Sequence, residues 1–222
     1  MEIVIVGSRN QGDECKEKFG ERHNVRLVSS LTAVDEVGNA EVVMDFIAAP
    51  GSLAVYGALP GLFVFIDASI HPVKVPKEAV EMLKGRIFGF CGLRSLINRE
   101  VLEIALIDDK DLESARSICE KLTTEYKIVA HQAGMVTPRI LCMIINEAYL
   151  TLQEGTATRE DIDLAMKLGT NYPYGPFEWA ERIGLKSVVE VLNASRIESG
   201  DPRYEVCELL TRKAKESVSN QA

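Results

Sequence analysis

The first segment that could do chemistry is a glycine-bounded loop between an apolar run and a polar stretch. Residues 7–12 read GSRNQG and follow the apolar residues 3–6. A glycine-rich turn between a strand and a helix is where dinucleotide-binding domains hold a pyrophosphate, because the N–H groups at the helix start point at the phosphates. Gly7 and Gly12 stand at the outer glycine positions, and Arg9 replaces the middle one. The Arg9 side chain would crowd the backbone approach, although its charge suits phosphate.

The second part of such a site is an acidic residue at the end of the next strand, which holds the ribose hydroxyls. Ser29 and Ser30 stand there instead. The loop therefore predicts a phosphate-binding turn without its usual ribose partner, and an ordinary strand-to-helix turn is the alternative.

The cysteines and histidines lack the spacing of a metal site. There are five cysteines and three histidines, and no two cysteines form a C-x-x-C pair. An odd number of widely spaced cysteines argues against a disulfide framework and against zinc. We therefore expect no metal, and reduced thiols in a cytoplasmic protein. The cysteines are Cys15, Cys91, Cys119, Cys142 and Cys207.

Short apolar runs alternate with amphipathic stretches as far as Ala130. Continuous apolar runs are typical of buried strands, and helical spacing fills the gaps, as at Leu112, Ile118 and Leu122. This alternation predicts an α/β fold with a parallel sheet of βαβ units. The predicted strands are Ile3–Val6, Val25–Val28, Glu41–Ile47, Leu62–Asp67, Ile87–Cys91, Glu103–Ile107 and Tyr126–Ala130, and the predicted helices are Gly12–Phe19 and Asp111–Glu125.

After Gly134 the pattern predicts helices only. Thr137 and Pro138 suit a helix start, an apolar face follows over residues 140–152, and Gly155 suits the helix end. We therefore predict two domains, a Rossmann-like sheet domain over residues 1–132 and an all-helical domain over residues 133–222. The later predicted helices are Thr158 to about Gly169, one from Glu178, Lys186–Glu198 and Arg203–Glu216.

Composition limits the partners. Lys and Arg total 25 and Asp and Glu total 33, for a net charge of −8, which argues against nucleic acid because phosphate binding needs clustered cations. Residues 46–66 carry no charge and are long enough for a bilayer, but glycines and prolines interrupt them. Two buried strands explain this run better. With Glu2 at the N-terminus and only a short apolar run behind it, we expect no signal peptide and no membrane partner.

The helical half carries a series of short motifs. In chain order they are residues 134–139 (GMVTPR), 146–148 (NEA), 154–155 (EG), Thr158 with 161–163 (DID), 165–169 (AMKLG), 173–177 (PYGPF), 183–185 (IGL) and 200–204 (GDPRY). In content and order this series closely resembles the C-terminal domain of the 3-hydroxyacyl-CoA dehydrogenase family. The first half resembles the Rossmann domain of that family more weakly, in strand order and in residues 39–45 (NAEVVMD).

The resemblance implies NAD-linked oxidation of a 3-hydroxyacyl-CoA to the 3-oxoacyl thioester, in fatty acid metabolism. In the family a histidine removes the hydroxyl proton, and a glutamate twelve positions later orients it; a serine and an asparagine help to hold the substrate oxygen. Glu103 matches the glutamate, and Cys91 stands at the histidine position. Pro138 stands at the asparagine position, before Arg139. Because a thiol beside a carboxylate is less acidic, we expect Cys91 to be a buried structural thiol.

The family serine falls near Ile70 or His71, and on Ser69 only if the register slips. His71 is a candidate substitute base, because the pKa of histidine suits the task, and a packing or surface role before Pro72 is the alternative. The resemblance also implies a set of cofactor-binding positions, which are Gly7, Ser8, Arg9, Gly12, Ser29 and Ala48.

Three functions stay open on the sequence. The chain is a working or weak dehydrogenase, an acyl-CoA- or nucleotide-binding protein without the chemistry, or a dimeric interaction protein. The helical motifs and Glu103 support the first function, and the departures at Arg9, Ser29, Cys91 and Pro138 support the second. The apolar face over residues 140–152 is core or a dimer seam, and we expect a homodimer through the helical domain. The sheet domain is short for the family and the usual tail is missing, so we expect a family member shortened in its cofactor half.

Overall fold

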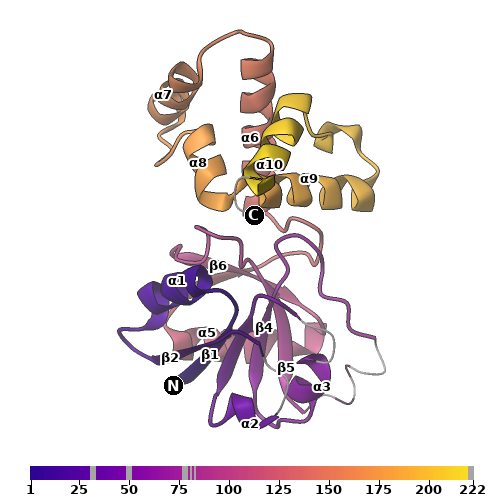
Figure 1. Ribbon diagram of the computed structural model, residues 1–222. Coiled ribbons are helices and arrows are strands. Elements are labelled where there is room, and N and C mark those ends of the chain that lie inside the picture. Colours follow the sequence, from indigo (N-terminus) through magenta and orange to yellow (C-terminus); the bar gives the residue numbers. More distant parts are fainter. Residues whose placement is uncertain (31–33, 49–51, 77–79, 81, 83, 220–222) are drawn as a thin grey trace. The chain divides into compact units, whose positions relative to one another are not determined.

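The chain divides after His131 into a sheet unit (Met1–His131) and a helical unit (Gln132–Ala222) (Figure 1). The computed structural model describes residues 1–30, 34–48, 52–76, 80, 82 and 84–219. In the described part of the chain, every helix is too short or too polar to cross a membrane.

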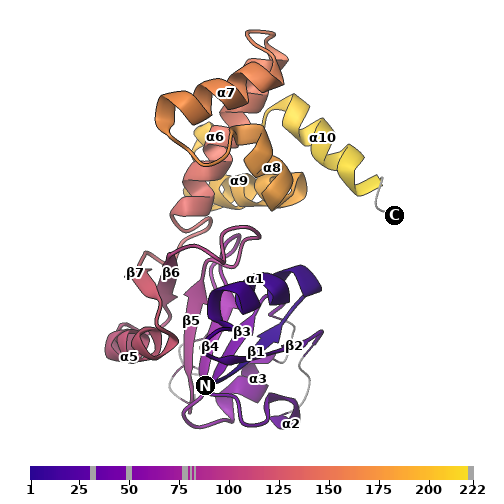
Figure 2. The same cartoon turned by 90° about the vertical axis from the view of Figure 1, so that its left-hand side faces the viewer.

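The sheet unit is built on seven strands in the order β2-β1-β3-β4-β5-β6-β7, which Figure 2 shows across the sheet. The chain runs from β1 outward to β2 and then returns to β3 on the other side of β1. This reversal is the topological switch point at which open α/β sheets bind ligands, outside the carboxyl ends of the strands. The strands are β1 (Glu2–Val6), β2 (Asn24–Val28), β3 (Val42–Asp45), β4 (Phe63–Asp67), β5 (Arg86–Phe90), β6 (Val101–Leu106) and β7 (Glu125–Ile128).

Two strands run against the other five. β6 pairs with β5 in the antiparallel direction and β7 follows the direction of β6, while every other neighbouring pair is parallel. The predicted parallel sheet is therefore parallel except at the β5–β6 pair. The physical reason is the connection: residues 91–100 join β5 to β6 without a helix. A parallel neighbour needs a crossover of about a dozen residues or more, usually helical.

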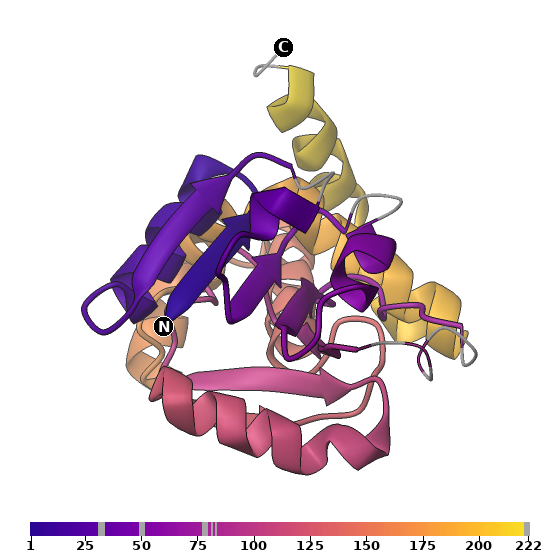
Figure 3. The same cartoon turned by 90° about the horizontal axis from the view of Figure 1, so that it is seen from below.

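Helices cover both faces of the sheet, as Figure 3 shows from below. α1 (Arg9–Phe19) and α5 (Leu112–Leu122) share one apolar core with the sheet, through residues such as Cys15 and Ile118. α2 (Val34–Val37) and α3 (Ser52–Gly57) lie over the opposite core, through Val37 and Tyr56. A 3₁₀ turn, η1 (Asp109–Asp111), precedes α5. The predicted α/β class is confirmed, with helices on both faces of a mostly parallel sheet.

The helical unit packs around α6 (Thr137–Gln153), which contacts α8 (Pro176–Ile183), α9 (Leu185–Ser199) and α10 (Glu208–Ser219). The ring of Tyr149 on α6 lies 4.8 Å from that of Phe177 on α8, and both residues are buried. The unit is completed by α7 (Arg159–Thr170) and the 3₁₀ turn η2 (Pro202–Tyr204).

The last predicted helix, Arg203–Glu216, is wrong at its start. Residues 202–204 form η2, and α10 begins only at Glu208. The side-chain amide of Asn146 explains the gap, because it donates to Glu205 O at 2.9 Å and accepts from Cys207 N–H at 3.0 Å. A side chain that satisfies the backbone in this way replaces helical hydrogen bonds.

Candidate active site

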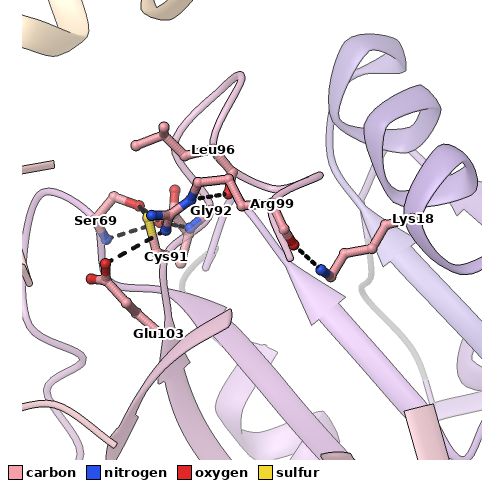
Figure 4. A network of polar contacts seen from close by, with 8 residues as sticks. Lys18, Ser69, Cys91, Gly92, Leu96, Arg99 and Glu103 are labelled. Atoms are coloured by element: carbon pink, nitrogen blue, oxygen red, sulfur yellow. Dashed lines mark hydrogen bonds and ion pairs between the residues drawn. The ribbon is translucent and has the colours of Figure 1, made fainter. Parts of the chain in front are cut away.

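Three strands bring Ser69, Cys91 and Glu103 together (Figure 4). Ser69 follows β4, Cys91 follows β5 directly, and Glu103 lies within β6. Ser69 Oγ lies 4.0 Å from Cys91 Sγ, and Cys91 N–H donates to Glu103 O at 3.1 Å. The serine found at this cluster is therefore Ser69, the position that matches the family serine only if the register is shifted. The antiparallel turn of β6 is what returns Glu103 to the end of β5.

The hydroxyl of Ser69 is committed to a neighbouring carboxylate. Asp67 Oδ1 accepts from Ser69 Oγ at 2.5 Å, from Ser69 N–H at 2.9 Å and from Gly92 N–H at 3.1 Å. Because a hydroxyl has one proton, we assign that proton to Asp67 rather than to the thiol at 4.0 Å. Burial raises the pKa of Asp67, and its bonds from Ser69 and Gly92 oppose that shift. Asp67 thus ties the end of β4 to the end of β5.

Cys91, which the sequence resemblance assigns to the position of the family base, is a buried thiol. Its side chain is 0% exposed. Burial raises the pKa of Cys91 to about 12; nearby Arg99 opposes the shift, and Glu103 and Asp67 add to it. Near neutral pH such a thiol keeps its proton, so it is neither a nucleophile nor a base.

Glu103 is paired with a residue that the sequence reasoning missed. Arg99 Nη2 lies 3.5 Å from Glu103 Oε1, and Arg99 Nε donates to Leu96 O at 3.0 Å. Glu103 is 5% exposed, so its charge has a counter-ion inside the protein. The signal that could have found Arg99 is its position four residues before Glu103, next to the strand start.

Helix α1 holds the connection that carries Arg99. Lys18 Nζ donates to Arg99 O, as Figure 4 shows. One turn earlier, both carboxylate oxygens of Glu14 accept from Ser95 N–H, at 2.9 and 3.0 Å. Ser95 has φ +63°, a left-handed backbone that a side chain tolerates only where it is held. Helix α1 therefore holds the segment 91–100 at two points, Ser95 and Arg99.

The other candidate positions differ in burial and in hydrogen-bonding groups. His71 is exposed on the segment after β4, whereas Cys91 and Glu103 are buried. Nearby, His131 accepts from Val73 N–H through Nε2 at 2.7 Å, a partner that the sequence did not indicate. Pro138 is buried in the first turn of α6, where it has neither an N–H nor a side-chain donor.

Arg139, next to Pro138, has a structural environment. Its guanidinium donates to Ala133 O, lies 3.6 Å from Glu198 Oε2 and lies over the ring of Tyr204 at 5.6 Å. These contacts join the start of α6 to α9 and η2 within the helical unit.

In the glycine-bounded loop of residues 7–12, the side chain of Gln11 hydrogen-bonds to Ser8. Ser8 is the N-cap of α1, and Gln11 Oε1 accepts from Ser8 N–H at 2.8 Å and from Ser8 Oγ at 2.9 Å. Gly12 meets the packing role of the last fingerprint glycine, because a Cβ there would lie 3.0 Å from Leu27 on β2. Arg9 and Ser29 are exposed.

An aromatic side chain lies at the switch point. Phe46 follows β3, and its ring centroid is 5.1 Å from that of Phe90 in an edge-to-face arrangement. A Cβ on Gly92 would lie 2.9 Å from two Phe46 ring atoms, and a Cβ on Gly7 would lie 3.3 Å from Phe46. Phe46 therefore spans from the glycine loop after β1 to the residue beside Cys91.

The turn after Phe46 is fixed by Asp45. This carboxylate is 0% exposed and accepts from Ile47 N–H and Ala48 N–H, each at 2.8 Å, and from Tyr56 Oη at 2.6 Å. Ala48, a cofactor-binding position by resemblance, takes φ +46° and is exposed.

Among known protein families, the match falls within the helical unit. The family described as 3-hydroxyacyl-CoA dehydrogenase, C-terminal domain, matches residues 134–222. The chain is 43% identical over 86 residues to a 3-hydroxyadipyl-CoA dehydrogenase of Escherichia coli, covering 39% of the chain and 18% of that protein. It is 34% identical over 113 residues to a 3-hydroxybutyryl-CoA dehydrogenase of Bradyrhizobium diazoefficiens, covering 51% of the chain and 39% of that protein. The matches thus span less than half the length of these two relatives.

Solved structures extend the likeness of fold to the sheet unit. The crystal structure of (S)-3-hydroxybutyryl-CoA dehydrogenase from Ralstonia eutropha aligns with 97% of the chain and 94% of its own, with a TM-score of 0.73 at 19% identity. A 3-hydroxybutyryl-CoA dehydrogenase structure from Escherichia coli aligns with 71% of the chain and 33% of its own, with a TM-score of 0.58 at 27% identity. Residues 134–222 therefore belong to the family of the 3-hydroxyacyl-CoA dehydrogenase C-terminal domain, and the chain as a whole shares the fold of these solved dehydrogenases, a Rossmann-like sheet unit followed by a helical unit.

Proposed function

We propose that this chain is a 3-hydroxyacyl-CoA dehydrogenase-like protein in which oxidation of 3-hydroxyacyl-CoA thioesters, the NAD-linked chemistry of fatty acid metabolism, is weak or absent. The observation that carries the proposal is Cys91. It is a buried thiol at the place of the family base, beside a glutamate whose charge Arg99 already balances.

The chemical argument starts from the proton that must leave the substrate hydroxyl. A general base needs a pKa near the working pH and must be free to accept a proton. The pKa of Cys91 is raised to about 12, so the thiol holds its proton near pH 7. Losing the base costs about 10²–10⁴ in rate.

The hydrogen-bond donors that would hold the substrate oxygen are also missing. The Ser69 hydroxyl donates its hydrogen bond to Asp67, and Pro138, at the asparagine position, has no donor. Losing one such donor costs about 10² or more in rate. The two losses together support a protein that keeps the fold and the acyl-CoA class of ligand without ordinary turnover.

The test combines ligand binding with turnover in the full chain. Calorimetric titration with acetoacetyl-CoA is expected to show binding, and acetoacetyl-CoA-dependent NADH oxidation is expected to stay at least about 10²-fold below that of a working family member. Saturable turnover at an ordinary rate, lost in Glu103→Gln, would contradict the proposal. A rate that drops in His71→Ala would instead assign the residual proton transfer to His71, against its exposed position.

The helical unit suggests a homodimer as well. Leu168 is 78% exposed and Leu164 is 53% exposed on α7, and Ile140 on α6 is 55% exposed. Large apolar side chains at the surface are typical of an interaction site where they lie together. We therefore propose self-association through this unit.

The free cysteines of the chain agree with a reducing, cytoplasmic location.

A further inference from the structure

We infer that the crevice at the switch point is closed by Phe46 and Gln11, so that this chain does not hold a dinucleotide as its relatives' fold implies. This inference goes beyond the proposed function, because it concerns cofactor binding and not the missing base. It rests on three separate positions around the same edge of the sheet.

The first position is the phosphate-binding turn. In a working fingerprint the free N–H groups at the helix start receive the pyrophosphate, and the middle glycine lets the backbone approach it. Here Gln11 Oε1 already accepts from Ser8 N–H, and a Cβ on Gly7 would lie 2.7 Å from the same oxygen. The side-chain carbonyl of Gln11 thus lies over the glycine turn, and Arg9 replaces the middle glycine.

The second position is the crevice beyond that turn. A dinucleotide crosses the switch point between the carboxyl ends of β1 and β3. The Phe46 ring lies there, against Gly7 at the end of β1 and against Gly92 and Phe90 at the end of β5. The ring therefore fills the route from the glycine turn to Cys91.

The backbone of Phe46 is held on both sides, so the ring cannot leave the crevice through a shift of the backbone. Phe46 N–H donates to Val6 O at 2.9 Å, which extends the β1–β3 pairing by one residue. On its other side, buried Asp45 holds the N–H groups of Ile47 and Ala48 while Tyr56 Oη donates to it. Three elements, β1, β3 and α3, therefore position this one side chain.

The third position is the ribose site. A carboxylate at the end of β2 normally accepts from the ribose hydroxyls. Ser29 and Ser30 stand there, both exposed, and a serine hydroxyl is a weaker acceptor than a carboxylate. The residues present therefore do not fit NAD at the phosphate, the crevice or the ribose.

The experiment is calorimetric titration of the full chain with NADH alone. The wild type is expected to show no saturable binding up to about 1 mM. Phe46→Ala is expected to bind NADH at least about tenfold more tightly than the wild type, and adding Arg9→Gly and Gln11→Ala is expected to strengthen binding further. Circular dichroism and the thermal midpoint check that each variant is folded.

Phe63→Ala is the matched control. Phe63 is a partly buried phenylalanine packed against the same core, but it lies at the start of β4, at the opposite edge of the sheet. Its truncation removes the same ring without opening the switch point, so no gain in NADH binding is expected.

Two results would overturn the inference. One is saturable binding of NADH by the wild type below about 100 μM. The other is a folded triple variant, Arg9→Gly, Gln11→Ala and Phe46→Ala, that gains no more affinity than Phe63→Ala. If Phe46→Ala does not fold, the wild-type titration still decides. A wild type that binds NADH but turns over no substrate overturns this inference alone and leaves the proposed function in place.

Discussion

The guanidinium of Arg99 lies 3.5 Å from the carboxylate of Glu103, inside the cluster that also holds Cys91. Arg99 is a permanent cation. A buried carboxylate needs such a partner, because an uncompensated charge in the interior is costly. Arg99 therefore compensates the charge of Glu103 inside the sheet unit.

Removing Arg99 should destabilise the sheet unit. Arg99→Leu removes the cation 3.5 Å from the buried carboxylate of Glu103, and we expect a loss of about 1–3 kcal/mol in the free energy of unfolding, measured by urea denaturation. Arg86→Leu is the control, because the Arg86–Asp111 pair is more exposed and should contribute less than about 1 kcal/mol. Equal losses in the two variants would show that Glu103 does not depend on Arg99.

The Cys91 thiol should make stability fall at alkaline pH. Its pKa in the folded state, about 12, lies above that of an ordinary thiol. Between the ordinary value and about 12, the folded state keeps a proton that the unfolded state loses, so stability is retained below this window and falls as the pH rises through it. One proton changes the free energy of unfolding by about 1.4 kcal/mol per pH unit.

The measurement for Cys91 is a difference between two proteins. Denaturation of wild type and Cys91→Ala at several pH values from neutral to alkaline cancels the other titrating groups. The wild type is expected to lose stability more steeply than the variant. Parallel slopes would mean that Cys91 titrates as an exposed thiol, against its 0% exposure.

Self-association through the helical unit should depend on its exposed apolar side chains. Leu168→Glu places a charge at a side chain that is 78% exposed, and we expect the sedimentation-derived mass to fall from dimer to monomer. Met82→Glu is the control, since Met82 is 79% exposed in the sheet unit and should leave the mass unchanged. A wild type that is monomeric at high concentration would remove this proposal.

Sequence patterns identified most of what is local in this fold. Runs such as Ile3–Val6 and Leu62–Asp67 predicted strands because buried strands are continuously apolar, and the helical motifs carried the family assignment. The direction of β6 was missed, because it depends on how ten residues fold between strands, and no periodicity records that.

The candidate site was predictable only in part. Spacing placed Glu103 twelve residues after Cys91, and a close look at Ser8 and Gln11 would have shown a capping box. The position of Phe46 could not be predicted from the sequence, because Phe46 and Gly92 are far apart along the chain and lie close together only in the folded sheet. The sequence alone did not decide whether Ser69 or a position near Ile70 and His71 matches the family serine. A shift of one residue along an extended chain turns the side chain to the other side, so the register decides.

The most direct test of the account joins its two parts in one turnover assay. We predict that the wild type shows no ordinary acetoacetyl-CoA-dependent NADH oxidation, because Cys91 is not a base and Phe46 closes the crevice. Cys91→His combined with Phe46→Ala should raise the rate by about 10² or more, and Glu103→Gln in that background should remove the gain. Ordinary turnover by the wild type that is lost in Glu103→Gln would contradict the account.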